Sequence, residues 1–266
     1  PGIDCAGTVA YSRSKKFSIG DKVVIIASPA GSRINGGFSK YIKIDSKWVS
    51  KIPKGLNEKS TMIYGTAGFT AMHIIQKILK SKINNDLPIL VTGGSGGVGS
   101  FSIFILSKLG FNITASTRTL KNKNFLKSIG ANNIILDKTF KNENELPMQK
   151  KMFSTCIDSV GGQSLGFILK RIVNDGSCYT VGFSQSNELA NINLTAFILR
   201  GIKLIGIHTE SINRHHRENV WKKISLFNKV NKFPKIIYKE IRFSLLKKTL
   251  VKFNQQKSGR FLIKIN

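Results

Sequence analysis

The glycine-rich segment at residues 93–99 is the part of this chain best suited to chemistry. It follows a short apolar run at 89–92, typical of a buried strand, and precedes an apolar stretch of helical length at 100–109. A strand, a tight turn and a helix N-terminus direct backbone N–H groups and the positive end of a helix dipole toward one point. Because that point suits the pyrophosphate of a dinucleotide, we expect a cofactor site here.

The spacing of Gly94, Gly96 and Gly99 matches the G-x-G-x-x-G pattern, which by itself also fits a bare surface turn. A second strand candidate at 111–116 follows after one helix length, and the resulting βαβ unit favours the dinucleotide site. In that pattern Gly94 allows the turn, Gly96 lets the backbone approach the pyrophosphate, and Gly99 lets the helix pack on the strand.

The end of the second strand indicates which dinucleotide is bound. Proteins that prefer NAD carry Asp or Glu about 20 residues beyond the glycines. Residues 116–121 read Ser-Thr-Arg-Thr-Leu-Lys and contain no carboxylate. Arg118, with hydroxyls and Lys121 nearby, offers a charged fork to a 2′-phosphate, which favours NADPH. The alternative is that Arg118 and Lys121 are only two cations of a cation-rich chain.

The elements around this unit fall into three regions. Residues 1–57 contain short β segments, which predict a barrel-like or sandwich-like start, at 4–9, 22–26 and 40–44. Asn57 can cap a helix over 58–76, and strands and helices then alternate, which predicts an open, mostly parallel sheet. The expected strands are 89–94, 111–116, 133–136, 154–158, 177–182 and 202–207, and the expected helices are 100–109, 121–129 and 163–172. The chain then returns to helices over 214–228 and after Ser244, and to a strand at 260–265.

Composition excludes several classes of protein. With 266 residues, of which 41% are hydrophobic, the chain can build one large or two ordinary cores. No apolar run approaches the roughly 18 residues that span a bilayer, and no secretory signal is visible before Pro1, so we expect a cytoplasmic protein without a membrane segment. Cys5, Cys156 and Cys178 are widely spaced, and the histidines lack ligand spacing, so we expect no metal.

The charge of the chain leaves a second class of function open. Lysine and arginine exceed aspartate and glutamate by 42 − 14 = 28. Such a balance is typical of nucleic-acid-binding proteins, but these cations are spread along the whole chain and form no basic tail or aromatic platform. We therefore interpret the charge as a compositional bias and do not expect a nucleic-acid partner. A positive field would also attract polyanionic small molecules such as nucleotides or coenzyme A.

Several motifs together resemble the medium-chain dehydrogenase/reductase superfamily. The resemblance covers essentially the whole chain and is strongest to the NADPH-dependent acryloyl-CoA reductases of its quinone-oxidoreductase branch. The motifs are PGIDCAGTV at 1–9, GDKV at 20–23, GGFS at 36–39, GTAGFTA at 65–71, the segment 91–100, FILR at 197–200 and GRFLIKIN at 259–266.

The resemblance implies an α/β fold: a Rossmann doubly wound parallel sheet plus a split GroES-like β domain that is partly missing at its N-terminal side. It assigns residues 1–57 and 213–266 to the catalytic GroES-like domain and 58–212 to the NADPH-binding domain, and it implies a homodimer. It also implies the cofactor contacts. These are Ser95, Gly96, Gly97 and Val98 for the pyrophosphate, Thr117 and Arg118 for the 2′-phosphate, Asn133 on the adenine side, Phe183, Ile198 and Thr209 around the nicotinamide, and Asn266 closing the site.

The chemistry implied is hydride transfer from NADPH to the β-carbon of a 2-enoyl-CoA such as acryloyl-CoA. Zinc-dependent relatives carry His-Glu where this chain has Ile3 and Asp4, which implies a zinc-free reaction. The tyrosine that the family places beside the nicotinamide would precede Pro1, so the catalytic residue stays unassigned. Asp158, the last residue of a predicted strand, is expected to be a turn or cap residue rather than a catalytic one. The alternatives are a general quinone or enone oxidoreductase, or a nucleic-acid-binding protein that has kept the fold.

Overall fold

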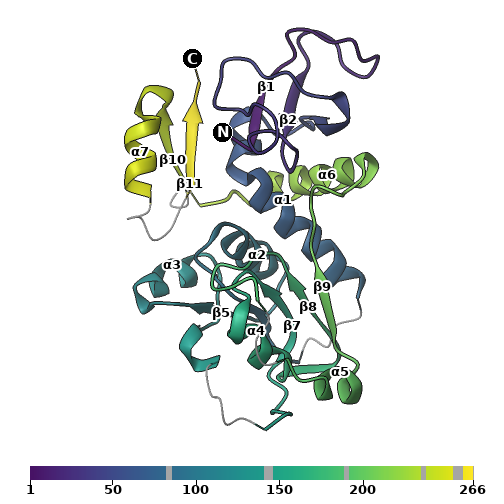
Figure 1. The fold of residues 1–266 in the computed structure, drawn as a ribbon, viewed down its shortest axis with the longest axis vertical. Helices are drawn as coiled ribbons and strands as arrows, with labels where there is room; N and C mark the ends of the chain where they lie inside the picture. Colours follow the sequence, from purple (N-terminus) through teal and green to yellow (C-terminus); the bar gives the residue numbers. More distant parts are fainter. Residues whose placement is uncertain (82–85, 141–145, 189–191, 235–237, 254–259, 266) are drawn as a thin grey trace. The chain divides into compact units, whose positions relative to one another are not determined.

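The computed structural model describes residues 1–81, 86–140, 146–188, 192–234, 238–253 and 260–265 (Figure 1). The chain divides into two compact units. Unit 1 comprises Pro1–Thr70 and Thr209–Asn266, and unit 2 comprises Ala71–His208. The first boundary falls inside helix α1 (Glu58–Lys80), and the second follows the last strand of unit 2. The domain assignment expected from the sequence remains a prediction.

Unit 2 is built on a six-stranded sheet in the order β6-β5-β4-β7-β8-β9, with every neighbouring pair parallel. The strands are β4 (Ile89–Val91), β5 (Ile113–Thr117), β6 (Asn133–Leu136), β7 (Phe153–Asp158), β8 (Ile172–Thr180) and β9 (Lys203–Gly206). Within unit 2 the chain first forms β4 in the middle of the sheet and then adds β5 and β6 on one side of it. It then crosses to the other side of β4 and adds β7, β8 and β9. This order is that of the doubly wound Rossmann sheet and confirms the predicted fold class.

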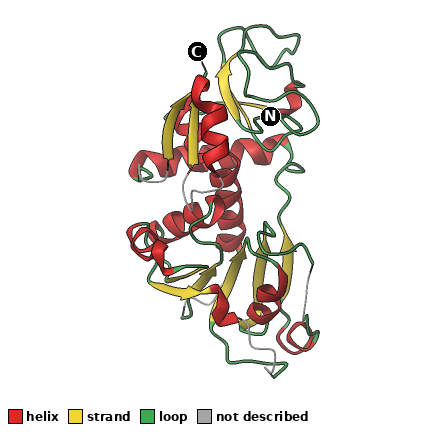
Figure 2. Ribbon diagram, turned by 60° about the vertical axis from the view of Figure 1, so that its left-hand side comes forward, coloured by secondary structure: helices red, strands yellow, loops and turns green. Residues whose placement is uncertain are grey.

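Helices connect these strands (Figure 2). They are α2 (Gly97–Lys108), α3 (Lys123–Ser128), α4 (Gly162–Leu169) and α5 (Thr195–Arg200), with 3-10 helices η2 (Leu120–Asn122) and η3 (Asp137–Phe140). Right-handed crossovers place the connections of the two halves on opposite faces of the sheet. Helix α2 buries Phe101 and Ile103 among other apolar residues, while Leu165 of α4 and Ala196 of α5 share one core cluster with Cys156 of β7. Helix α5 was not predicted from the sequence.

Unit 1 contains a three-stranded antiparallel sheet in the order β1-β2-β3. Its strands are β1 (Cys5–Thr8), β2 (Lys22–Ile25) and β3 (Val49–Lys51), the last preceded by the 3-10 helix η1 (Ser46–Trp48). The strand expected at 40–44 is wrong. The Ser39 hydroxyl donates to the carbonyls of Gly36 and Tyr41 at 2.9 and 2.7 Å, so local side-chain bonds tie this segment into a turn instead of a ladder. The third strand is supplied by β3.

Helix α1 begins where the sequence predicts. The Asn57 side chain accepts from the Ser60 amide, and the Ser60 hydroxyl accepts from the Asn57 amide, both at 2.8 Å. This reciprocal cap satisfies donors that a helix start leaves unpaired. Seven residues further along, at Gly65 (φ 51°), the helix is interrupted. The Asp4 carboxylate accepts from the Thr66 amide at 2.8 Å just beyond this kink and lies 3.7 Å from the guanidinium of Arg260.

The C-terminal part of unit 1 contains α6 (Arg214–Val230), β10 (Tyr238–Arg242), the 3-10 helix η5 (Phe243–Leu245), α7 (Leu246–Phe253) and β11 (Arg260–Lys264). Strands β10 and β11 pair in parallel, and Trp221 of α6 packs on Phe69 of α1 with ring centroids 5.6 Å apart. Among the described residues, no helix is both long enough and apolar enough to cross a membrane.

A buried cation in α6 holds the loop that follows β2. Arg217 is 2% exposed and donates to the carbonyls of Ile26 at 2.8 Å, Ala27 at 3.3 Å and Thr209 at 3.5 Å. Ala27 has φ 44°, a conformation that L residues rarely adopt. The guanidinium therefore stabilises a strained turn by satisfying carbonyls that the sheet does not pair.

We predict that Arg217→Met destabilises the protein by about 1–3 kcal/mol, because the apolar stem is kept while buried carbonyls lose their donors. Chemical unfolding monitored by circular dichroism measures the change. Lys223→Met, on the exposed side of the same helix, is the matched control and should leave stability nearly unchanged. Equal stability of the two variants would contradict the role assigned to Arg217.

Candidate dinucleotide site

The crossing from β4 to α2 forms the glycine-rich loop, and its glycines differ in what requires them. Gly93 has φ 57°, so the turn depends on glycine there. Gly94 is not in the left-handed region. A Cβ on Gly94 would instead lie 3.0 Å from Leu126 and 3.1 Å from Ile103, in the core beneath the loop. The sequence-based assignment of the turn to Gly94 is therefore wrong: Gly93 makes the turn, and Gly94 allows close packing.

Gly96 and Gly99, the next two glycines of the pattern, also differ in what surrounds them. A Cβ on Gly99 would lie 2.4 Å from the Gly93 carbonyl oxygen and 2.9 Å from Gly94 Cα, so the helix can cross the strand end only with glycine there. A Cβ on Gly96 would meet only the Gly93 oxygen, at 3.1 Å, and Gly96 is exposed. The space beside Gly96 is therefore open to solvent or to a ligand.

Helix α2 begins without a side-chain cap from its N-cap residue. Its N-cap residue, Gly96, makes no side-chain capping bond, and the first turn contains no acidic residue. The amides of Gly97, Val98 and Gly99 belong to this turn, where an α-helix provides no acceptor for them. Ser95, Gly97 and Val98 are each half-buried. This arrangement of donors and dipole fits a phosphate group.

Strands β4 and β7 lie side by side where the strand order reverses, and a buried polar pair joins their ends. The Thr92 hydroxyl donates to the Asp158 carboxylate at 2.6 Å, and the Ser159 hydroxyl donates to the Thr92 carbonyl at 2.9 Å. The other carboxylate oxygen accepts from the Gly161 amide at 2.9 Å. Burial raises the pKa of Asp158, and its hydrogen bonds with Thr92, Gly161 and Val160 act in the opposite direction. Asp158 therefore shapes the crevice in which such sheets bind ligands, as expected for a turn residue.

The carboxyl end of β5 lies next to the glycine loop. Thr117 is buried and Arg118 is exposed. Asn122, which sequence reasoning missed, donates to the Ser95 hydroxyl at 3.1 Å and to the Thr117 hydroxyl at 3.4 Å. A carboxylate from outside 116–121 contacts this strand end, because the Ser116 hydroxyl donates at 2.6 Å to Asp137, the first residue of η3. Asp137 follows β6, and no residue spacing in the glycine motif could reveal it.

The other cofactor contacts predicted from the sequence lie in different parts of the chain. Phe183 is 70% exposed in the loop after β8, whose neighbours Ser184 and Gln185 donate to Ser159 and Val160. It therefore lies at the carboxyl edge of the sheet. Thr209 belongs to unit 1, and Asn266 lies outside the described residues.

The structure does not bring Asn133 and Ile198 to that edge. Asn133 is the first residue of β6 and pairs with Thr114, so it lies three residues before the carboxyl end of its strand. Ile198 lies in α5, and Arg200 of the same helix donates to the carbonyl of Ile172, the first residue of β8. Both residues are thus near the amino edge of the sheet.

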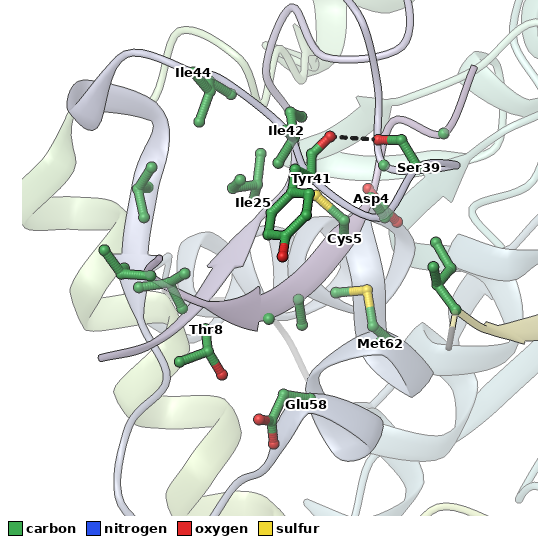
Figure 3. Close-up of a pocket in the computed structure, with 18 of the residues that line it drawn as sticks. Asp4, Cys5, Thr8, Ile25, Ser39, Tyr41, Ile42, Ile44, Glu58 and Met62 are labelled. Atoms are coloured by element: carbon green, nitrogen blue, oxygen red, sulfur yellow. Dashed lines mark hydrogen bonds between the residues drawn. The ribbon is translucent and has the colours of Figure 1, made fainter. Parts of the chain in front are cut away.

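Unit 1 has an open cavity of about 2080 Å³, lined by β1, the segment 39–44, α1 and β11. Figure 3 shows Ile42 and Ile44 on one side of β1 and Glu58 and Met62 of α1 on the other. This volume exceeds the roughly 300–1,000 Å³ of small-ligand pockets, so the lining alone identifies no ligand. Burial, followed by the charge of Asp4, raises the pKa of the Cys5 thiol to about 11, which leaves it protonated and poorly nucleophilic at neutral pH.

Comparison with known proteins identifies the family. Residues 97–225 match the zinc-binding dehydrogenase family. The chain is 30% identical over 266 residues to YhfP of Bacillus subtilis, named as a quinone oxidoreductase, covering 99% of this chain and 80% of that protein. The chain belongs to the zinc-binding dehydrogenase family of the medium-chain dehydrogenase/reductase superfamily. It is also 33% identical over 226 residues to acrylyl-CoA reductase AcuI of Ruegeria pomeroyi, covering 85% of this chain and 68% of that protein.

Solved structures of relatives confirm the superfamily that the motifs resemble. The yhdH oxidoreductase of Salmonella enterica in complex with NADP has a TM-score of 0.92 and 30% identity, covering 100% of this chain and 82% of that one. YhfP of Bacillus subtilis with NAD bound has a TM-score of 0.90 and 30% identity, covering 99% of this chain and 80% of that one. The relatives thus include proteins seen with either dinucleotide.

The family is named for zinc, but the donor set for that metal is missing from the part of the chain that the structure describes. No group of three or more His, Cys, Asp or Glu side chains lies there in a position to hold a metal ion. Structural zinc sites take four protein ligands, and catalytic ones take three. The described residues therefore do not fit zinc, and no chemical step is assigned to it.

The contrast between two glycines gives a test of the loop. We predict that Gly96→Val abolishes dinucleotide binding in a folded protein, because the added side chain enters the open space beside the helix N-terminus. We predict that Gly99→Val unfolds the protein, because its side chain would collide with the backbone of Gly93 and Gly94. Fluorescence titration with NADPH and thermal unfolding without ligand measure the two effects. Unaltered affinity in a folded Gly96→Val variant would show that the loop is only a structural turn.

Proposed function

We propose that this oxidoreductase binds NADPH and reduces the activated C=C bond of a 2-enoyl-CoA, such as acryloyl-CoA, without zinc. The observation that supports the cofactor most directly is the start of α2, which has no side-chain cap and lies where the strand order reverses. Next to it, at the end of β5, the chain has Arg118 where proteins that prefer NAD have a carboxylate. The complex of the Salmonella enterica relative with NADP supports the same cofactor. The name of the Ruegeria pomeroyi relative supports the acceptor.

In this proposal the first-turn amides of α2 and the Ser95 hydroxyl donate to the pyrophosphate. Arg118 provides two parallel N–H donors to the 2′-phosphate, and Lys121 adds a second charge. The Thr92–Asp158 hydrogen bond joins the ends of the paired strands β4 and β7 next to this loop. Phe183 offers an apolar surface for the nicotinamide half, and Thr209 and Asn266 remain proposed contacts.

The bound NADPH would supply the hydride for the β-carbon of the alkene, and the resulting enolate would take a proton from water at its α-carbon. The protein's part is to position the two reactants and to stabilise the charge that develops on the carbonyl oxygen. The protonated Cys5 and the fully bonded Asp158 fit this mechanism, because neither is available as a nucleophile or base. The catalytic residue stays unassigned, and the homodimer and the cytoplasmic location are further proposals.

A quinone is the second candidate acceptor, because the Bacillus subtilis relative is named as a quinone oxidoreductase. Both acceptors use the same hydride donor and differ only in the group that receives it. The cofactor loop therefore favours neither, and the acceptor must be decided by activity measurements.

We predict that Arg118→Ala weakens NADPH binding by about 1–3 kcal/mol and leaves NADH binding nearly unchanged, because only NADPH carries the 2′-phosphate. Titration of both dinucleotides by fluorescence measures the difference. Lys127→Ala, an exposed cation on the neighbouring helix, is the matched control for the loss of one charge. Equal losses for both dinucleotides would assign Arg118 a structural role and contradict the NADPH preference.

The acceptor and the zinc-free mechanism can be tested in one experiment. NADPH oxidation is followed with acryloyl-CoA, crotonyl-CoA and a quinone, before and after exhaustive chelation, with metal analysis of the same sample. We expect the highest kcat/KM with an enoyl-CoA and no loss of rate on chelation. A higher kcat/KM with the quinone would support the second candidate. Stoichiometric zinc on which the rate depends would overturn the zinc-free mechanism.

A further inference from the structure

Asn122 links the two parts of the cofactor site that come from different strands. Its side-chain nitrogen donates to the Ser95 hydroxyl in the glycine-rich loop at 3.1 Å and to the Thr117 hydroxyl at the end of β5 at 3.4 Å. Ser95 and Thr117 are 22 positions apart in the sequence, and both belong to the proposed phosphate contacts. One amide group therefore bridges the pyrophosphate region and the 2′-phosphate region.

The position of Asn122 between η2 and α3 leaves its side chain available for this bridge. Asn122 is the last residue of η2 and directly precedes α3, and the cap of this helical segment lies earlier, where the Thr119 hydroxyl accepts from the Lys121 amide at 3.3 Å. Asn122 makes no side-chain capping bond with α3. Its side chain is directed to the glycine-rich loop instead.

The direction of these bonds determines what Ser95 can do. An amide nitrogen only donates, so the Ser95 oxygen acts as acceptor toward Asn122. A hydroxyl carries a single hydrogen, and the bond with Asn122 leaves that hydrogen free. Phosphate oxygens only accept, and a hydroxyl with a free hydrogen is the matching donor. Thr117 differs from Ser95, because it accepts from Asn122 but donates its own hydrogen to the Thr119 carbonyl at 3.4 Å.

We propose that Asn122 is a positioning residue of the cofactor site, which turns the Ser95 hydroxyl hydrogen toward the pyrophosphate of the bound dinucleotide. The proposal rests on the proposed function, because it needs a dinucleotide at this loop. The effect acts through Ser95, and both NADPH and NADH share the pyrophosphate. Asn122 therefore contributes to the affinity for either dinucleotide, in contrast to the selective role of Arg118.

The test compares Asn122→Asp, Asn122→Ala and the control Asn124→Asp by fluorescence titration with NADPH and NADH. Aspartate has the same shape but only accepts, so it would take the Ser95 hydrogen and add a charge that repels phosphate. We expect about tenfold weaker binding of both dinucleotides for Asn122→Asp and a loss of about threefold or more for Asn122→Ala. Asn124 is exposed two residues further on and undergoes the same change of charge, so Asn124→Asp should change affinity by less than about twofold.

A double-mutant cycle separates positioning from a general structural effect. If Asn122 acts through Ser95, Asn122→Ala should cost no further affinity in a Ser95→Ala background. Additive losses, or affinities equal to the wild type in the Asn122 variants, would overturn the proposal. Thermal unfolding without ligand identifies an Asn122→Asp variant that does not fold, in which case the alanine cycle decides. A wild-type protein that binds neither dinucleotide would refute the proposed function itself, whatever the variants do.

Discussion

The close contact between Gly99 and Gly93 is the constraint on which the candidate site depends. Helix α2 can start directly above the end of β4 only because Gly99 has no side chain to strike the Gly93 carbonyl. That start places uncapped amides at the point where the strand order reverses. With a longer or less tightly packed connection between β4 and α2, the sheet would keep its core, but the helix dipole would point elsewhere. Close packing and anion binding are therefore consequences of the same missing methyl group.

A second constraint is the buried carboxylate at the junction of β4 and β7. Asp158 is fully buried, and burial alone would favour its protonated form. The Thr92 hydroxyl and the amides of Val160 and Gly161 donate to it and favour the ionised form. The Asp158 carboxylate therefore holds the backbone of the turn that follows β7. A carboxylate at the carboxyl edge of such a sheet invites a catalytic interpretation, which its full set of donors argues against.

In unit 1, charged side chains from distant parts of the sequence hold irregular backbone in place. Asp4 accepts from the Thr66 amide beside the kink at Gly65, and Arg217 donates to the carbonyls of the loop that contains Ala27. Each irregular segment has backbone groups that a regular helix or sheet would pair. In each segment one side chain that forms several hydrogen bonds replaces the missing backbone hydrogen bonds. The positions of β1, α1 and α6 within this unit are thereby linked through polar as well as apolar contacts.

Local patterns in the sequence determined the central part of this protein. The βαβ unit, the parallel sheet and the cap at Asn57 could be predicted, because each depends on hydrophobic period, glycine spacing or residues a few positions apart. The superfamily was indicated by the resemblance of motifs along the whole chain. The prediction of a β strand at 40–44 was wrong, because the Ser39 hydroxyl donates to nearby backbone carbonyls. The β propensities of single residues do not include such local hydrogen bonds. Helix α5 was missed, because its six residues are too few for a periodic signal.

Only the tertiary structure decided which glycine makes the turn, which residues meet at the carboxyl edge, and which do not. Gly93 rather than Gly94 has the positive φ, Asp137 at the start of η3 accepts from Ser116, and Asn122 bridges the glycine-rich loop and the end of β5. Asn133 and Ile198 lie at the opposite edge, although the resemblance grouped them with the cofactor contacts. The physical reason is that these outcomes depend on backbone dihedral angles and on contacts between residues far apart in the chain. A linear sequence specifies such contacts only through the fold.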